Sequence, residues 1–189
     1  MAPRIPPRPS SAGPAEMRAA IAALRVENPR HPILTTDGDR PKALNALGTF
    51  AHHPELTTAY HHFVGHLLYG TTLDLRTREL VILRVAAVRE CEYEWLQHVV
   101  IGSDVGLSDD EIAAARSVGD TPLLTAVDEL LATARISDAT WAALSESFDT
   151  QQLLDLVFTV GAYDLLAMVF LSLGVEVDAD LAKWKRPSP

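Results

Sequence analysis

The chain has 189 residues, of which 48% are hydrophobic and 22% charged, and its formal net charge at pH 7 is −9. This length suits one domain with a well-buried core and is too short for two large ones. The acidic balance argues against nucleic acid and anionic membrane surfaces as partners. A single cysteine cannot form an internal disulfide, so we expect a cytoplasmic protein.

A proline-rich arm, MAPRIPPRPSSAGP, occupies residues 1–14. It contains five prolines and no apolar core of the kind found in a secretory signal. We expect this arm to be extended, and either disordered or laid across a neighbouring subunit. Residues 15–189 are predicted to form a single helical domain.

Helical patterns follow the arm in chain order. Residues 15–25 are rich in helix formers, and two further helices are expected at 42–51 and 54–69, the second starting with Pro54. After Leu73, polar residues in a first turn precede an apolar stretch at 80–88, which is typical of a helix buried over most of its surface.

The next helices have clear start and stop signals. The helix that follows residue 90 is expected to end at Gly106. Ser108 and Glu111 form a capping box for the following helix, and Thr121 with Pro122 at the first helical position begins another.

The last long helix is predicted at residues 150–173, after a shorter helix in the segment SDATWAALSESF. Asp155 and Asp164 interrupt its apolar run, so we expect a buried core helix and no membrane span. No segment alternates between apolar and polar residues long enough to indicate a strand. The sequence therefore predicts an all-α protein of about eight helices.

The segment ECEYEWLQH, residues 90–98, contains the single cysteine. Cys91, Glu94 and His98 are spaced to lie on one helix face, and Glu94 and His98 are separated as in carboxylate–imidazole pairs that transfer protons. Cys91 is expected in the first helical turn, where the helix dipole lowers the pKa of a thiol while neighbouring carboxylates raise it. A buried structural cysteine and a solvated Glu–His pair are the alternative interpretations.

Four other residues are candidates for chemistry. Glu79 begins the apolar segment ELVILRVAAV, and a buried carboxylate is costly unless paired, although it could instead interact with the helix dipole. His62 and His66 have a spacing that can bind a transition metal, but no third ligand is evident, so no metal is predicted. Tyr163 either points its hydroxyl into a cavity or buries its ring.

Residues 75–114, LRTRELVILRVAAVRECEYEWLQHVVIGSDVGLSDDEIAA, resemble the carboxymuconolactone decarboxylase family, which also contains the alkylhydroperoxidase D-type enzymes. The likeness covers most of residues 45–180. It implies an all-helical, alkylhydroperoxidase D-like fold. It also implies a homo-oligomer, a trimer or hexamer in preference to a dimer, with sites near the subunit interfaces.

The peroxidase branch of this family has the pattern Glu-x11-Cys-x-x-Cys-x-x-x-His, and the matching positions here are Glu79, Cys91, Glu94 and His98. Glu94 stands where that branch has the cysteine that attacks peroxide, and Cys91 matches the resolving cysteine. A two-thiol cycle is therefore not available within one chain. The decarboxylase branch has Glu-x-x-x-His on the equivalent helix, which Glu94 and His98 match, so the mixed pattern favours acid–base chemistry.

We therefore expect a carboxymuconolactone decarboxylase-like lyase without a cofactor. In this interpretation Glu94 and His98 transfer protons on a small, largely apolar organic acid or lactone, while Glu79 orients or holds a water. One alternative is a single-cysteine alkyl hydroperoxide reductase in which an external thiol restores Cys91. The other is a non-catalytic helical oligomer that binds a hydrophobic ligand.

A substrate carboxylate would need a local cation, because an acidic protein does not attract anions at long range. Arg76, Arg78 and Arg84 are the candidates, and Arg84 lies inside the apolar stretch. If none of them can serve the Glu94–His98 site, neutral substrates are favoured. The residues expected to contact substrate are His62, His66, Arg84, Trp95 and Tyr163.

Overall fold

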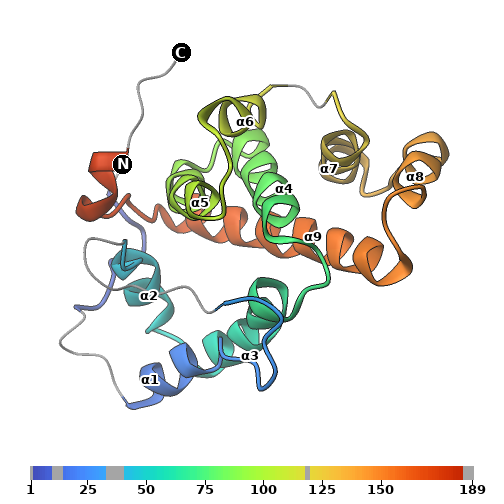
Figure 1. Ribbon diagram of the computed structural model, residues 1–189. Coiled ribbons are helices and arrows are strands. Elements are labelled where there is room, and N and C mark those ends of the chain that lie inside the picture. Colours follow the sequence, from blue (N-terminus) through green and yellow to red (C-terminus); the bar gives the residue numbers. More distant parts are fainter. Residues whose placement is uncertain (1, 10–14, 33–40, 118–119, 185–189) are drawn as a thin grey trace. The chain divides into compact units, whose positions relative to one another are not determined.

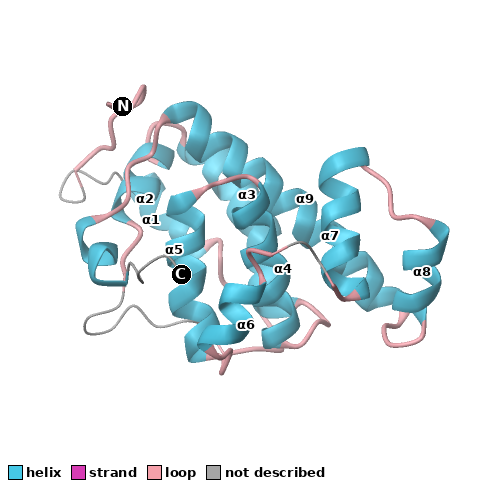
Figure 2. Cartoon of the chain, turned by 90° about the horizontal axis from the view of Figure 1, so that it is seen from above, coloured by secondary structure: helices cyan, strands magenta, loops and turns pink. Residues whose placement is uncertain are grey.

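The computed structural model describes residues 2–9, 15–32, 41–117 and 120–184. These residues form helices and no strands, as Figure 2 shows, which confirms the all-α prediction. The helices, labelled in Figure 1, are α1 (Ala15–Ala22), α2 (Leu44–Phe50), α3 (Pro54–Gly65), the π-helix η2 (His66–Gly70), α4 (Leu75–Val88), α5 (Glu92–Asp104), α6 (Asp109–Ala114), α7 (Pro122–Thr133), α8 (Asp138–Ser145), α9 (Thr150–Leu173) and the 3₁₀-helix η3 (Ala179–Trp184).

The chain divides into two compact units. The first consists of Met1–Thr71 and Val169–Pro189, and the second of Thr72–Met168. Most of α9 belongs to the second unit, and its last turn belongs to the first.

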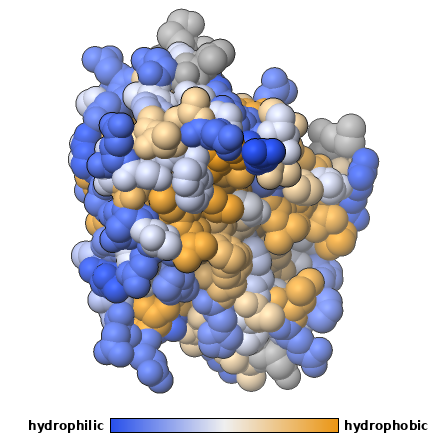
Figure 3. Space-filling model, turned by 90° about the vertical axis from the view of Figure 1, so that its right-hand side faces the viewer, coloured by the Kyte–Doolittle hydropathy of each residue, from blue (hydrophilic) through white to orange (hydrophobic). Residues whose placement is uncertain are grey.

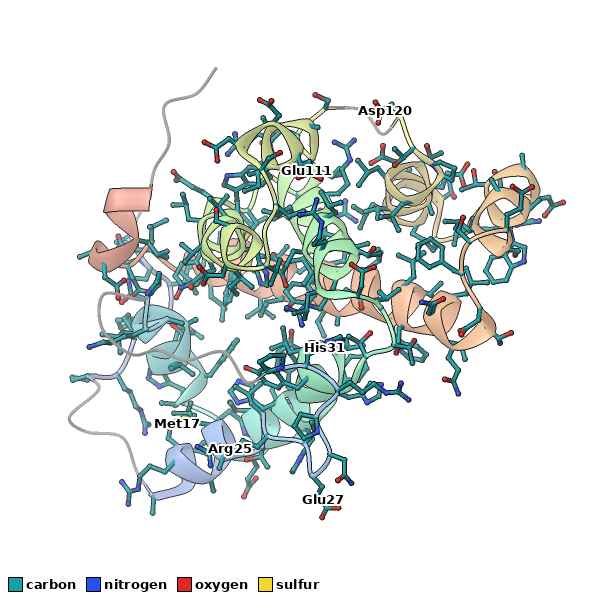
Figure 4. All side chains as sticks on the ribbon, viewed as in Figure 1. Met17, Arg25, Glu27, His31, Glu111 and Asp120 are labelled. Atoms are coloured by element: carbon teal, nitrogen blue, oxygen red, sulfur yellow. The ribbon has the colours of Figure 1, made fainter. Side chains whose placement is uncertain are left out.

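In the first unit, α1 packs against α3. Met17, which Figure 4 labels on α1, forms a small buried cluster with Ala20 and Ala51. The buried ring of His61 on α3 donates a hydrogen bond from Nδ1 to the Ala20 carbonyl, at 2.8 Å. The described part of the arm, residues 2–9, also binds to this unit.

Two backbone hydrogen bonds fix the arm on its own chain. The Arg4 N–H donates to the Leu173 carbonyl at 2.8 Å, and the Arg8 N–H donates to the Gly48 carbonyl at 3.0 Å. A Cβ added to Gly48 would lie 2.6 Å from the Arg8 carbonyl oxygen, so the arm packs closely against α2 at a position that requires glycine.

The helix expected at 54–69 is divided in the structure. α3 ends at Gly65, and the π-helix η2 begins at the next residue, His66, and ends at Gly70. A Cβ at Gly70 would lie 2.8 Å from Nδ1 of His66, so this imidazole covers the glycine. Apolar spacing alone did not indicate the wider turn, because a single π turn changes the periodicity only slightly.

In the second unit, α4 lies between α5 and α7, and α6 contacts both α4 and α5 (Figure 1). All six residues from Val81 to Ala86 are buried, which confirms a helix enclosed over most of its surface. The remaining core of this unit comes chiefly from Leu96, Val99, Val100, Ile112, Ala115, Leu124, Ala126, Val127, Leu144, Leu153, Leu156, Val160 and Ala167.

Local capping signals position the helices of this unit. The Ser108 hydroxyl accepts from the Glu111 N–H at 3.2 Å, and the Glu111 carboxylate accepts from the Ser108 N–H at 2.8 Å. Figure 4 labels Glu111 on α6. Thr121 caps α7, and Gly106, with φ of +87°, follows the end of α5. These contacts confirm the predicted capping box of α6, the predicted N-cap of α7 and the predicted end of α5 before Gly106.

α9 is buried on one side only, which corrects the expectation of a wholly buried core helix. Its inner face includes Asp155, whose carboxylate accepts hydrogen bonds from the N–H and hydroxyl of Thr72 at 2.6 and 2.7 Å. Its outer face exposes several large hydrophobic side chains. By length and composition alone, α9 could also cross a membrane.

Candidate functional site

Glu79 lies at the centre of a buried polar group between α4 and α5. It is fully buried, and its Oε1 accepts a hydrogen bond from Nε of the adjacent Arg78 at 2.7 Å. Its Oε2 accepts from Nδ1 of His98 on α5, also at 2.7 Å. Arg78 and His98 are themselves 1% and 7% exposed, so the whole array is shielded from solvent.

Opposing effects determine the protonation state of Glu79. Burial by itself would raise the pKa of this carboxyl, but the charge and hydrogen bond of His98, with a further contribution from Arg78, outweigh burial and lower the pKa. An ionised carboxylate only accepts hydrogen bonds, so the Nδ1 of His98 must be the protonated donor. Nε2 of His98 is then the ring nitrogen that Glu79 does not bind.

Glu94 lies on the same helix as His98 but in a different environment. It is 1% exposed, and neither carboxyl oxygen has a hydrogen-bond partner among the described groups. Burial raises the pKa of Glu94 well above its usual value, the contact with the Cys91 thiol lowers it less, and the charge of Asp164 raises it further. Burial therefore favours the protonated, neutral form of the Glu94 carboxyl.

This geometry corrects the expected Glu94–His98 pair. The two side chains are four residues apart on α5, but the imidazole of His98 binds Glu79 instead of Glu94. Glu79 therefore orients His98 directly, whereas its expected role was to orient or hold a water.

Cys91 is the N-cap residue of α5, one position before the first helical turn in which it was expected. It is 1% exposed. Burial raises the pKa of its thiol to about 12, and the neighbouring Glu94 carboxyl adds to this rise, while backbone N–H groups oppose it only in part. The thiol is therefore protonated at neutral pH, which disfavours its use as a nucleophile.

Tyr163 on α9 packs against His98. The two ring centroids are 5.0 Å apart at an interplanar angle of 86°, an edge-to-face contact, and Tyr163 is 3% exposed. The neighbouring Asp164 accepts a hydrogen bond from Nη2 of Arg89 at 3.1 Å, and its Oδ1 also binds Nε of Arg89.

The Arg89–Asp164 ion pair was missed as part of the site. Its sequence signal was the aspartate within the apolar segment VGAYDLLAMV, because a charge in a packed helix needs a partner. Sequence spacing gave no indication that Asp164 would influence Glu94.

The guanidinium of Arg84 is already bound by other groups and is not available for a substrate carboxylate. Its Nε and Nη2 bind the two carboxylate oxygens of Asp128 on α7 at 2.6 and 2.9 Å, and its Nη1 binds the carbonyls of Ala115 and Ser117. This arginine thus connects α4 with α7. The expectation that it holds a substrate carboxylate remains unsupported by these contacts.

The other expected contact residues lie in two places. Trp95 is buried on α5 with the Arg116 guanidinium 4.1 Å above its ring. His62 and His66 are exposed in the first unit, whereas Glu79, Glu94 and His98 belong to the second. Over the described ranges, no group of three or more His, Cys, Asp or Glu side chains could hold a metal ion.

Comparison with known families adds to this geometry. The family model described as "Carboxymuconolactone decarboxylase family" matches residues 54–139. This segment belongs to the carboxymuconolactone decarboxylase family. It extends from the start of α3 into α8 and includes Glu79, Cys91, Glu94 and His98, so the resemblance inferred from the sequence is confirmed. No curated protein matches the chain by sequence.

Solved structures share the fold of this chain. A peroxidase-related protein from Ralstonia eutropha JMP134, with an alkylhydroperoxidase AhpD core, is 19% identical with a TM-score of 0.68, over 95% of this chain and 94% of that one. One from Silicibacter sp. TM1040 is 16% identical with a TM-score of 0.64, over 74% and 80%. The debrominase Bmp8 is 11% identical with a TM-score of 0.66, over 95% of both chains. The fold is therefore AhpD-like.

Proposed function

We propose that this protein is an acid–base enzyme in which Glu94 donates a proton and His98 accepts one from a small, largely apolar lactone. The observation that carries the proposal is the buried carboxyl group of Glu94, whose raised pKa favours its protonated form. A carboxylic acid that stays neutral at pH 7 can donate a proton to a substrate oxygen or to a conjugated carbon.

His98 is the residue that accepts a proton from the substrate. Glu79 fixes its Nδ1–H through the 2.7 Å hydrogen bond, so Nε2 is the nitrogen that takes a proton. The carboxylate also stabilises the imidazolium that forms. Glu79 is thus a positioning residue that acts on substrate through His98.

The charges near the site favour a neutral lactone over an organic acid. Four arginines of the second unit already bind carboxylates: Arg76 with Glu111, Arg78 with Glu79, Arg84 with Asp128, and Arg89 with Asp164. A substrate carboxylate would have to compete with these pairs, whereas a lactone carbonyl needs only the proton of Glu94.

The single-cysteine peroxidase is the second candidate, because two of the similar structures are named as peroxidase-related. Those names describe proteins at 19% identity or less. The pKa of about 12 for Cys91 opposes this candidate, since peroxide reduction by a thiol begins with the thiolate.

The test is proton exchange on a panel of unsaturated lactones, with and without a carboxylate group, followed by NMR in deuterated water. Wild-type protein should introduce deuterium at a lactone carbon. Glu94→Gln and His98→Asn should each lower this rate by roughly 10²- to 10⁴-fold. Cys91→Ala should keep most of the rate, and Glu92→Gln, which changes an exposed carboxylate of the same helix, is the matched control.

A peroxide assay separates the alternatives. With dithiothreitol as reductant, the wild type should not consume cumene hydroperoxide. Consumption that Cys91→Ser abolishes would replace the proposal with the peroxidase. Failure to exchange any lactone or to consume peroxide, combined with saturable binding of an apolar ligand, would support a non-catalytic binding protein instead.

A further inference from the structure

Thr159 is a buried threonine on the inner face of α9, within the second unit. It is 0% exposed, so it contributes nothing to the molecular surface, one face of which Figure 3 shows. Its hydroxyl oxygen has no hydrogen-bond partner among the residues that the structure describes. A buried hydroxyl without a partner lowers the stability of a fold, which makes this threonine a costly choice unless the hydroxyl binds something else.

Other helical hydroxyl groups of this chain avoid that loss by bonding to their own helix. In six cases the side chain donates to the backbone carbonyl four residues earlier, at 2.8 to 3.0 Å: Thr49, Thr57, Thr58, Ser103, Thr133 and Ser145. The corresponding carbonyl for Thr159 is that of Asp155, and Thr159 does not make this bond. Its hydroxyl is therefore left for a group outside the backbone of α9.

Helix geometry places Thr159 next to the ring of Tyr163. The two residues are four positions apart, so they share the inner face of α9 on consecutive turns. Side chains of a helix lean toward its N-terminus, so the Tyr163 ring leans over the turn that carries Thr159. The same ring contacts His98 edge to face, with 5.0 Å between the ring centroids. The Thr159 hydroxyl and the His98 imidazole are thus two polar groups beside one aromatic ring.

Two aspartates hold this part of α9 against α4. The Asp155 carboxylate accepts from the N–H and hydroxyl of Thr72, just before α4, at 2.6 and 2.7 Å. The Asp164 carboxylate accepts from Nη2 of Arg89, at the C-terminal end of α4, at 3.1 Å. Thr159 lies between these aspartates, so its turn of the helix is fixed on both sides. A hydroxyl on such a rigid element can orient a ligand.

A hydroxyl group suits a lactone in particular. The oxygens of a lactone ring only accept hydrogen bonds, and a threonine hydroxyl can donate one. A carbonyl oxygen has two lone pairs, so it can accept from Thr159 and still receive the proton of Glu94. A ring without oxygen would leave the Thr159 hydroxyl unpaired and would therefore gain nothing from it.

From this arrangement we infer that the Thr159 hydroxyl donates a hydrogen bond to the carbonyl of a lactone bound beside His98. Thr159 is then a substrate-binding residue that orients the lactone and selects it over an oxygen-free ring of the same size. The contact rests on the proposed function, which supplies the lactone beside His98.

Binding of 2(5H)-furanone, an unsaturated lactone, tests this contact without requiring turnover. Thr159→Val keeps the shape of the side chain but removes the hydroxyl, so calorimetry on the full chain should show a dissociation constant raised about five- to ten-fold, as for one neutral hydrogen bond. Thr159→Ser keeps the hydroxyl and should remain close to the wild type. Cyclopentene has a ring of the same size without oxygen, and Thr159→Val should bind it at least as tightly as the wild type does.

Urea unfolding separates a ligand contact from a structural role. Thr159→Val should not lower the midpoint of unfolding, because the hydroxyl makes no bond within the fold. Thr57→Val is the matched control, since this buried threonine of α3 bonds to the carbonyls of Phe50 and His53 at 2.9 and 3.0 Å. It should lower the midpoint and leave furanone binding unchanged. A lowered midpoint for Thr159→Val with wild-type furanone binding would make the hydroxyl structural and overturn the contact.

Deuterium exchange distinguishes failure of this contact from failure of the proposed function. Thr159→Val should raise the KM for lactone exchange more than it lowers kcat. Furanone binding that depends on Thr159, without exchange of any lactone by the wild type, would support the contact and overturn the acid–base function. Exchange that Thr159→Val leaves unchanged would do the reverse. A wild type that binds furanone no more tightly than cyclopentene would also overturn the contact.

Discussion

Two buried carboxyl groups of the second unit differ in what surrounds them. Burial would raise the pKa of both, but Glu79 has His98 and Arg78 as partners, and its pKa is lowered. Glu94 has no comparable cation, and its pKa is raised. The environments thus separate the two groups into an ionised acceptor that holds His98 and a neutral acid that can donate, a division typical of acid–base sites.

The raised pKa of Glu94 predicts a stability that depends on pH. Above pH 4.5, the usual pKa of a glutamate, the unfolded chain releases this proton while the folded protein retains it. The stabilisation is complete below pH 4.5 and is lost as the pH rises toward the folded pKa, by up to about 1.4 kcal/mol per pH unit. Glu94→Gln should therefore become more stable relative to the wild type between pH 5 and pH 8, as measured by urea unfolding.

Glu92→Gln is the matched control, because it removes an exposed carboxylate from the same helix. It should keep the wild-type change of unfolding free energy with pH. If the difference between Glu94→Gln and the wild type is the same at pH 5 and pH 8, then Glu94 is not a buried neutral acid.

The sequence identified the individual site residues better than their partners. Cys91, Glu94 and His98 could be assigned to one helix because their spacing is local. The hydrogen bond from His98 to Glu79 joins residues 19 positions apart on different helices, so spacing along α5 could not predict it. The sequence also could not predict the direction of the Cys91 pKa shift. Burial is the largest cause of the rise, and burial depends on packing from other elements.

At the scale of the helices, Arg84 is expected to stabilise the contact between α4 and α7. Asp128→Ala would leave a guanidinium that is 7% exposed without its carboxylate. We expect a loss of about 3 kcal/mol in the free energy of unfolding, the lower end for a broken buried ion pair. Asp128 is itself 27% exposed, and the carbonyls of Ala115 and Ser117 still accept from Arg84.

The exposed ion pair of Arg135 with Asp138 provides the comparison, with side chains 77% and 98% exposed. Removing it by Arg135→Ala should cost about 0.5 kcal/mol or less. Both variants would be unfolded in urea under the same conditions. Equal losses would show that Arg84 and Asp128 contribute no more than a surface pair.

Helix ends were predictable where their signals are local. Ser108 with Glu111, Thr121 with Pro122, and Gly106 mark their boundaries through residues that are neighbours in the chain. The exposed side of α9 was not predictable, because apolar residues lie on every side of this 24-residue helix, and composition does not show which side other helices cover. The structure supplies that information through buried Asp155 and exposed Leu165.

At the scale of the whole molecule, the net charge acts on the stability of the folded state. The chain carries a formal charge of −9 at pH 7. Charges of one sign repel one another more strongly in the compact folded chain than in the expanded unfolded chain, so the net charge lowers the free energy of unfolding. This repulsion depends on ionic strength.

The free energy of unfolding should consequently rise as salt is added. Raising the ionic strength from about 10 mM to about 100 mM shortens the Debye length from about 30 Å to about 10 Å, which screens repulsion between charges of the same chain. Urea unfolding at both ionic strengths should show a higher free energy of unfolding at the higher one. A lower value there would mean that attractive ion pairs outweigh the repulsion.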